Sequence, residues 1–346
     1  GRYLMVKKKF VGFGEILLRL APDGYLRLAQ ANNFNLNYTG AEGNMAIALA
    51  YMGISAAMVT KFPDNEIGHC AKRMLSKFEV DTSHIAWGGE RLGVYYLERG
   101  ASQRPSKVIY DRRHSSIAEA DPIDFDWDDI FKDAGWFHFT GITVALSKNM
   151  QKICKQACVA AKRHGVKVSI DLNYRKSLWS TEEAQAAIKP LMQYVDVCIA
   201  NEEDSEKVLG IKVENTDITA GKLNIEGYSN LAKKLTDTYG FEKVGITLRE
   251  SISASINNWS AMLYADGKTY LSKKYSMQIV DRVGGGDSFA SGLIYACLND
   301  FDNQTAIEFA AGASCLKHSI EFDFNLSSVG EVMNLIGGDG SGRVQR

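Results

Sequence analysis

Three consecutive glycines precede an aspartate near the end of the 346-residue chain, where an apolar helical pattern begins. They are Gly284, Gly285 and Gly286, followed by Asp287. A glycine turn at a helix start exposes backbone N–H groups beside a partial positive charge, which can stabilise a phosphoryl group during transfer. Asp287 could then accept the proton of an attacking hydroxyl. Taken alone, the run favours a simpler interpretation, an aspartate that caps a helix after a flexible turn.

The elements that would position this run alternate between strands and helices. Strands are predicted at about 136–141, 167–174, 195–204 and 243–250, with helices at 148–165 and 181–194. This rhythm predicts a parallel sheet covered by helices, and such sheets bind ligands at the carboxyl ends of their strands. Further predictions are a first strand at 10–20, a helix ending at Gly53, a hairpin turning on Asp266-Gly267, and helices at 287–300 and 303–319.

The length permits one large α/β domain with an appendage or two medium domains, and we expect the first. A single domain is predicted over 5–336, with a small β lid from about 10–40 and 90–115 and a flexible tail at 337–346. The lid rests on a predicted hairpin, because 93–100 and 106–113 are short, aromatic and β-branched.

Composition limits the class of protein. Hydrophobic residues make up 45% and charged residues 23%, as in a folded globular protein. The formal net charge of -1 argues against nucleic acid or an anionic membrane surface as a partner. No apolar run reaches the roughly 18 to 20 residues that span a bilayer, so we expect a soluble cytoplasmic protein. Cys154 and Cys158 lie one helical turn apart without a second ligand pair, which favours core thiols over a zinc site.

Two segments resemble a known family. The segment DRVGGGDSFASGLIYA (281–296) resembles the C-terminal signature of the ribokinase-like, PfkB-type carbohydrate kinases, and TGAEGNMAIALAYMG (39–53) resembles their N-terminal signature. The likeness extends from about residue 10 to 335. It implies a three-layer α/β sandwich with a mostly parallel central sheet and a β lid. It also implies that Asp287 is the catalytic base and that Gly284, Gly285 and Gly286 form the anion hole, although Gly285 is commonly alanine in relatives.

The resemblance also implies ATP and Mg²⁺. The family motif Asn-x-x-Glu corresponds to Asn201-Glu202-Glu203-Asp204, with aspartate in the fourth place, which implies that Asp204 acts on Mg²⁺ through water. The same segment is equally compatible with an acidic first helical turn. The implied ATP contacts are Asn173, Asn201, Thr247, Arg249 and Ser251, although the usual glycines are missing there and an ordinary strand end explains Thr247 and Arg249 equally well. A monovalent cation is compatible with the family.

The segments VIYDRRHSS and SIDLNYRKSLW are similar to those of 2-keto-3-deoxygluconate kinases within the family. A sugar acid needs a counter-charge, which arginine can supply in bidentate form. The implied substrate contacts are Gly40, Ala41 and Asn44 in the N-terminal loop, Tyr95, Tyr110 and Arg112 in the lid, Arg175 beside the ATP phosphates, and Asp323. Cross-strand packing explains the tyrosines equally well, Phe322 replaces the usual glycine before Asp323, and Asp171 is interpreted as a structural anchor.

The sequence therefore predicts ATP-dependent phosphorylation of 2-keto-3-deoxygluconate at its C6 hydroxyl. One alternative is a family kinase for fructose, ribose or a nucleoside, and another is a catalytically idle sugar-binding protein on the same fold. A dinucleotide-binding oxidoreductase is disfavoured, because the first strand does not lead into a full G-x-G-x-x-G run that opens a helix. By analogy with the family, we expect a homo-oligomer that pairs through the lid.

Overall fold

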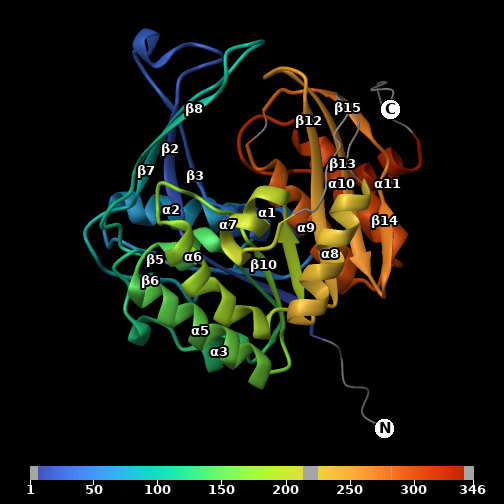
Figure 1. The fold of residues 1–346 in the computed structure, drawn as a ribbon. Helices are drawn as coiled ribbons and strands as arrows, with labels where there is room; N and C mark the ends of the chain where they lie inside the picture. Colours follow the sequence, from blue (N-terminus) through green and yellow to red (C-terminus); the bar gives the residue numbers. More distant parts are fainter. Residues whose placement is uncertain (1–6, 213–224, 282, 339–346) are drawn as a thin grey trace.

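The strands predicted at 136–141, 167–174, 195–204 and 243–250 lie side by side in one large sheet (Figure 1). The structure is a computed structural model that describes residues 7–212, 225–281 and 283–338. In spatial order the sheet contains β14 (Lys268–Leu271), β13 (Ile256–Ala265), β12 (Lys243–Ser251), β11 (Val197–Ala200), β10 (Lys167–Asp171), β9 (Ala134–Thr140), β1 (Lys9–Phe13) and β4 (Ala56–Val59), and β15 (Tyr275–Gln278) also pairs with β13. The strands from β4 to β12 are parallel, whereas β13 is antiparallel to its neighbours. The mostly parallel sheet was predicted correctly.

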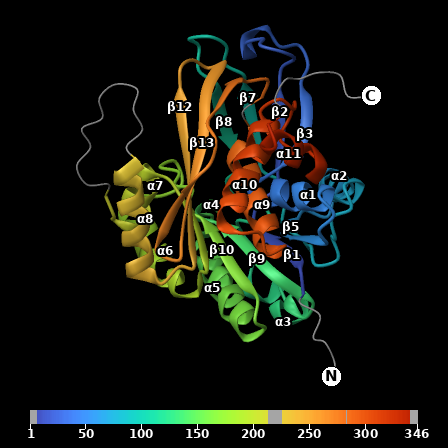
Figure 2. The same cartoon turned by 90° about the vertical axis from the view of Figure 1, so that its right-hand side faces the viewer.

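Helices cover both faces of this sheet, as Figure 2 shows. One face carries α3 (Trp127–Phe131), α4 (Gly141–Ala145), α5 (Lys148–Arg163), α6 (Thr181–Ile188), the 3₁₀ helix η3 (Lys189–Tyr194), α7 (Glu202–Leu209) and α8 (Ile225–Tyr239). The other carries α1 (Ala41–Tyr51), α2 (Glu66–Lys77), α9 (Gly285–Leu298), α10 (Asn303–Lys317) and α11 (Val329–Ile336). Alternate residues of a strand enter opposite cores: Phe137 packs on the first side and Trp136 on the second. Cys154 and Cys158 are buried in the first core.

A second, smaller sheet stands above one end of the large one (Figure 1). Its order is β3 (Asn35–Thr39), β2 (Leu17–Ala21), β7 (Val94–Glu98) and β8 (Lys107–Asp111), and the pairing of β7 with β8 confirms the predicted hairpin. The single strand predicted at 10–20 is wrong, because β1 and β2 belong to different sheets. The chain changes direction at Gly14, where a Cβ atom would lie 2.2 Å from the Glu42 carboxylate. The predicted lid range, which began at about residue 10, therefore includes a strand of the large sheet.

Other predicted boundaries shift for local reasons. The helix predicted at 181–194 is α-helical only as far as Ile188 and continues as the 3₁₀ helix η3. Pro190 lies in the first turn of η3 and has no backbone N–H to donate. The strand predicted at 195–204 ends at Ala200, because the side chain of Asn201 accepts a hydrogen bond from the Asp204 backbone and caps α7. The hairpin turn is confirmed: Asp266 and Gly267 have φ of 53° and 72°.

The remaining elements are short. They are β5 (Lys61–Phe62) paired with β6 (Ala86–Trp87), and the 3₁₀ helices η1 (Leu28–Gln30) and η2 (Pro122–Asp124). Residues 339–346, most of the predicted tail, lie outside the described residues. In the described ranges, no helix combines the length and apolar character needed to cross a membrane.

A buried ion-pair network attaches the smaller sheet to the C-terminal part of the chain. Arg19 on β2 is 1% exposed and pairs with the carboxylate of Asp323. Its second nitrogen lies 3.5 Å from the carboxylate of Asp281. Both acids are also buried, so removal of the arginine would leave unpaired charge in the interior.

Arg19→Met should therefore lower the free energy of unfolding by about 3–5 kcal/mol, as expected when one partner of a buried ion pair is removed. Urea denaturation followed by circular dichroism measures this change. The matched control is Arg163→Met, which removes an exposed ion pair with Asp128 and should change stability little. Equal losses in the two variants would contradict the role of the buried network.

Candidate active site

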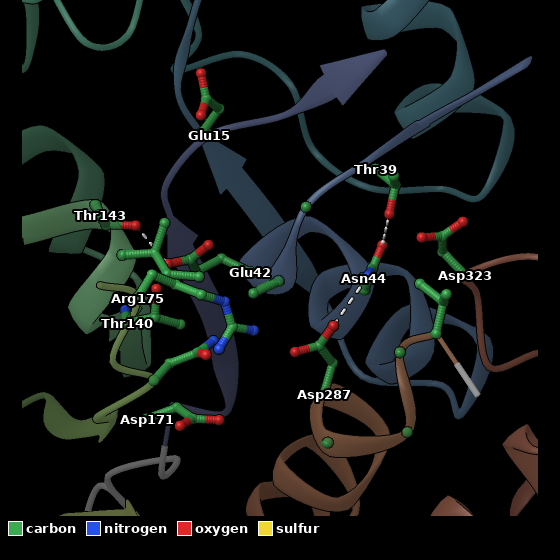
Figure 3. Close-up of a pocket in the computed structure, with 18 of the residues that line it drawn as sticks. Glu15, Thr39, Glu42, Asn44, Thr140, Thr143, Asp171, Arg175, Asp287 and Asp323 are labelled. Atoms are coloured by element: carbon green, nitrogen blue, oxygen red, sulfur yellow. Dashed lines mark hydrogen bonds between the residues drawn. The ribbon is translucent and has the colours of Figure 1, made fainter. Parts of the chain in front are cut away.

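A cavity of about 500 Å³ lies between the smaller sheet and the carboxyl ends of the parallel strands (Figure 3). It collects most of the residues that the sequence predicted as site residues. Those on its wall are Gly40, Ala41, Asn44, Tyr95, Tyr110, Arg112, Asn173, Arg175, Asn201, Asp204, Thr247, Gly284, Gly285, Gly286, Asp287 and Asp323. Segments far apart in the sequence thus meet at one place, which is the expected ligand edge of an α/β sheet.

Asp287 lies in the first turn of α9 and is held by a chain of hydrogen bonds (Figure 3). The Asn44 amide donates to a carboxylate oxygen of Asp287 at 3.0 Å, and the amide oxygen of Asn44 accepts from the hydroxyl of Thr39 at 2.7 Å. Burial raises the pKa of Asp287 to about 6, while the Asn44 hydrogen bond acts in the opposite direction. The carboxylate is therefore ionised at neutral pH yet basic enough to take a proton.

The glycine turn before Asp287 has little room for side chains at two of its positions. Gly284 has φ of 81°, and a Cβ atom there would lie 2.3 Å from the Asp323 carbonyl oxygen. A Cβ atom on Gly285 would lie 2.6 Å from the ring of His318, which gives a physical reason why this chain lacks the common alanine. Nothing lies within 4 Å of that position on Gly286. The first N–H groups of α9 have no partners within the helix and can receive an anion.

Acidic groups on the opposite wall repel one another. Asp204 is 7% exposed and accepts a hydrogen bond from the Tyr174 backbone at 3.2 Å. Burial raises the pKa of Asp204 to about 6. Desolvation, followed by the charges of Asp204 and Asp287, raises the pKa of Asp171 well above its usual value. Within the described part of the chain, no three His, Cys, Asp or Glu side chains lie close enough to hold a metal ion directly.

Arginines add positive charge around the cavity. The Arg112 guanidinium lies 4.5 Å from the ring centroid of Tyr110, and its Nε is 3.7 Å from a carboxylate oxygen of Glu15. Arg175 is exposed, and its guanidinium donates to the neighbouring carbonyl of Tyr174 at 3.3 Å. Figure 3 shows Arg175 facing Asp287 across the cavity.

The lid tyrosines fit both interpretations that the sequence left open. Tyr95 pairs across strands with Tyr110, and their ring centroids are 5.8 Å apart. Tyr95 also donates its hydroxyl to the Asp323 carboxylate at 3.0 Å. Tyr95 is 7% exposed, whereas Tyr110 is 43% exposed. Both nevertheless reach the cavity wall.

Two predicted ATP contacts, Arg249 and Ser251, are not among the residues that line this cavity. Arg249 donates to the side chain of Asn257 at 2.9 Å, and its other terminal nitrogen is 2.8 Å from Nε2 of His318. It also stacks on Trp259, with 4.5 Å between the guanidinium and the ring centroid. Ser251 donates to the same Asn257 at 3.2 Å. These contacts hold the β12–β13 hairpin.

Sequence reasoning missed Glu42, which lines the cavity although it is 2% exposed. Its carboxylate accepts hydrogen bonds from the Thr140 backbone at 3.0 Å and the Thr143 hydroxyl at 2.6 Å. Burial raises the pKa of Glu42 to about 7. The sequence feature that could have identified Glu42 is a charged residue at the start of an otherwise apolar helix. Glu15, two residues after the end of β1, was also missed; the sequence feature that could have identified it is an acid just beyond a strand end.

The fold and the cavity define a class of protein: an α/β protein with a smaller β sheet above a cavity that contains a carboxylate and a glycine turn at the start of a helix. The family model described as pfkB family carbohydrate kinase matches residues 7–319, and the chain belongs to this family. The predicted family, ribokinase-like fold and sugar kinase class are therefore confirmed.

Individual relatives agree with this assignment. A Thermotoga maritima crystal structure of 2-dehydro-3-deoxygluconokinase is 53% identical with a TM-score of 0.92, covering 95% of this chain and 99% of that chain. A Haloferax volcanii 2-dehydro-3-deoxygalactonokinase is 30% identical over 96% of this chain and 98% of its own length. An E. coli structure assigned as a ribokinase II, with ATP and Mg²⁺, shares the fold at 18% identity, covering 95% of this chain and 99% of that chain with a TM-score of 0.78.

The glycine turn generates a matched pair of variants. Gly284→Ala should lower the free energy of unfolding by roughly 1–3 kcal/mol, because the backbone is left-handed and the added methyl meets the Asp323 carbonyl. Gly286→Ala should unfold like the unmodified protein, because the added methyl meets nothing. Thermal and urea unfolding compare the two. Equal stability of both variants would show that the turn is not constrained as described.

Proposed function

We propose that the protein transfers the γ-phosphoryl group of ATP to the C6 hydroxyl of 2-keto-3-deoxygluconate, also called 2-dehydro-3-deoxygluconate. The products are the 6-phosphate and ADP. The proposal rests mainly on the Asp287 carboxylate. It lies at the start of α9, accepts a hydrogen bond from Asn44 and lines the cavity. The 53% identical relative named for this activity supports the choice of sugar.

The reaction proceeds by direct in-line transfer. Asp287 accepts the proton of the C6 hydroxyl while the hydroxyl oxygen bonds to the γ-phosphorus, and the bond from that phosphorus to the bridging oxygen of ADP breaks. The backbone N–H groups of Gly285 and Gly286 at the start of α9 receive the negative charge on the transferring group. Arg175 faces the same space and offsets charge on the phosphates. No covalent enzyme intermediate is required.

ATP would place its phosphates above the glycine turn, with Asn173, Asn201 and Thr247 along its length. Mg²⁺ would arrive with ATP and would offset part of the charge of its phosphates. The acidic wall fits a hydrated cation: after burial, the charge of Asp204 raises the pKa of Asp171, and a nearby cation would relieve this repulsion. Asp204 would act through water, because its carboxylate accepts from the Tyr174 backbone and its own backbone N–H donates to the Asn201 side chain, which together fix it in the wall.

The sugar would lie beneath the smaller sheet. Arg112 supplies the counter-charge for the carboxylate of a keto-acid, while Asn44, Gly40 and Ala41 border the position of its hydroxyls. One relative is named for 2-dehydro-3-deoxygalactonate, a sugar acid that differs from 2-keto-3-deoxygluconate in the configuration at C4. The C4 epimer is therefore the nearest alternative substrate. The single-domain division, the lid role of the smaller sheet, self-association through it and cytoplasmic location stay predictions.

A coupled ADP-release assay tests the proposal directly. The panel holds both C4 epimers of the keto-acid, gluconate, fructose, ribose and adenosine, each with Mg-ATP. We expect the highest kcat/KM with 2-keto-3-deoxygluconate, and Arg112→Met should lower that value by at least about tenfold while changing fructose turnover less. A preference for a neutral sugar would contradict the carboxylate assignment, and no turnover with any compound would favour a binding protein.

The base assignment makes a prediction about pH. Burial raises the pKa of Asp287 to about 6, so the ionised base is lost as pH falls through that value. The kcat/KM value, which reports the free enzyme, should therefore fall on the acid side with a midpoint near it. Asp287→Asn should lower kcat by more than about a thousandfold while sugar binding, measured by calorimetry, persists. As a control, Asp128→Asn removes an exposed carboxyl outside the cavity and should keep the acid limb. Near-native turnover by Asp287→Asn would exclude its role.

A further inference from the structure

Lys317, the last residue of α10, is completely buried beneath the glycine turn. Its Cε lies 3.5 Å from the place where a Cβ atom on Gly284 would stand. Its ammonium group donates a hydrogen bond to the carbonyl oxygen of Ile320 at 2.9 Å. Burying an ammonium group is unfavourable unless nearby charges and hydrogen bonds compensate, so its place next to the anion hole suggests a role.

The nearest carboxylates already have other partners. Asp323 accepts hydrogen bonds from Arg19 and from the Tyr95 hydroxyl. Asp281 accepts from two backbone N–H groups, each at 3.1 Å, and its carboxylate lies 3.5 Å from Arg19. Within the ranges that the structure describes, Lys317 forms no ion pair of its own. Its charge is therefore not neutralised by a single partner and acts on the surrounding groups.

Asp287 is one of the groups that feel this charge. The charged groups that face it are the carboxylates of Glu42, Asp171 and Asp323 and the cations of Arg175 and Lys317. After burial and the Asn44 hydrogen bond, Asp323 raises the pKa of Asp287, whereas Arg175 and Lys317 lower it. Arg175 has the larger effect of the two but is exposed to solvent and salt, whereas Lys317 is buried. Burial lowers the pKa of Lys317, and the charges of Asp281 and Asp323 act in the opposite direction and favour the ammonium form.

We propose that Lys317 is a positioning residue for phosphoryl transfer, whose buried ammonium keeps Asp287 ionised and fixes the segment beneath the glycine turn. This inference rests on the proposed kinase function of the cavity. The hydrogen bond to Ile320 holds the segment that leads to Asp323, whose carbonyl oxygen packs under Gly284. The charge and the hydrogen bond can be separated by substitution.

Lys317→Gln keeps an N–H donor for Ile320 but removes the charge. The acid limb of kcat/KM should then move to higher pH by about 0.5 to 1 unit, because a favourable charge near the base is lost. Turnover should fall about two- to fivefold at about pH 6 and change little at about pH 8, where Asp287 is ionised in both proteins. Lys317→Arg retains the charge, so its acid limb should lie at the same pH as that of the unmodified protein. The ADP-release assay across this pH range measures kcat and KM for each.

Lys317→Met removes both the charge and the donor, and should lower kcat at every pH by more than about tenfold while KM for the sugar changes less. If Lys317→Met does not fold, the position of the acid limb in Lys317→Gln alone tests the inference. Lys9→Met is the control: it removes a part-buried ammonium paired with Asp81 at 2.9 Å, outside the cavity, and should leave the limb unmoved.

An unmoved acid limb in Lys317→Gln would overturn the inference, even if kcat fell uniformly, because a purely structural lysine would behave in that way. If Lys317→Arg shifts the limb as far as Lys317→Gln does, the charge is not the cause and the inference also fails. The unmodified protein separates this result from the proposed function: absence of kinase activity there would remove the function itself, whereas an active protein with insensitive variants would remove only the role of Lys317.

Discussion

The hydrogen bond from Asn44 to Asp287 joins the starts of two helices that lie more than two hundred residues apart in the chain. For the bond to form, α1 and α9 must begin at the same end of the sheet and pack side by side (Figure 2). That requirement explains the tight approach of Gly40 to the Glu15 carbonyl, where a Cβ atom would lie 1.9 Å away. The glycine turn, the base and the N-terminal loop therefore form one unit, and the smaller sheet is attached to it through Arg19.

Negative charge is concentrated around the cavity to an unusual degree. Glu42, Asp171, Asp204 and Asp287 all have raised pKa values, chiefly because burial withholds water from them. A site of this kind disfavours anions unless cations accompany them. The phosphates of a nucleotide and the carboxylate of a sugar acid must therefore meet arginine, lysine or a metal ion. The same field keeps the base only weakly acidic, which suits proton abstraction near neutral pH.

Periodicity and local chemistry accounted for much of the fold. The apolar rhythm identified β9, β10, β12, α5 and the late helices, because each presents a continuous buried face. The change of sheet near Gly14 was not predicted, because the Glu42 carboxylate that packs against this glycine comes from another element and is not apparent from the local sequence. Helix ends moved where single residues, such as Pro190 and Asn201, act on the backbone.

The candidate site was likewise predicted where the local sequence was informative and missed where distant residues decide the structure. Residues within family signatures met at the cavity, whereas Arg249 lay in a separate cluster, because Asn257 and Trp259 on the neighbouring strand hold its guanidinium. No local pattern announces such partners. Buried charges such as Arg19 and Glu42 were missed for a related reason: their partners are distant in sequence, and an isolated charged residue usually indicates a solvated surface.

The ring of His318 fills the space beside Gly285, and it is fixed there by its donation to the Ser314 carbonyl and its bond with Arg249. Alanine at 285 and histidine at 318 are therefore mutually exclusive without rearrangement. If alanine replaces Gly285 first, its methyl group clashes with the ring of His318. If a smaller residue replaces His318 first, an empty space is left beside Gly285. The two positions should consequently change together across the lineage, and a designer who alters one must repack the other.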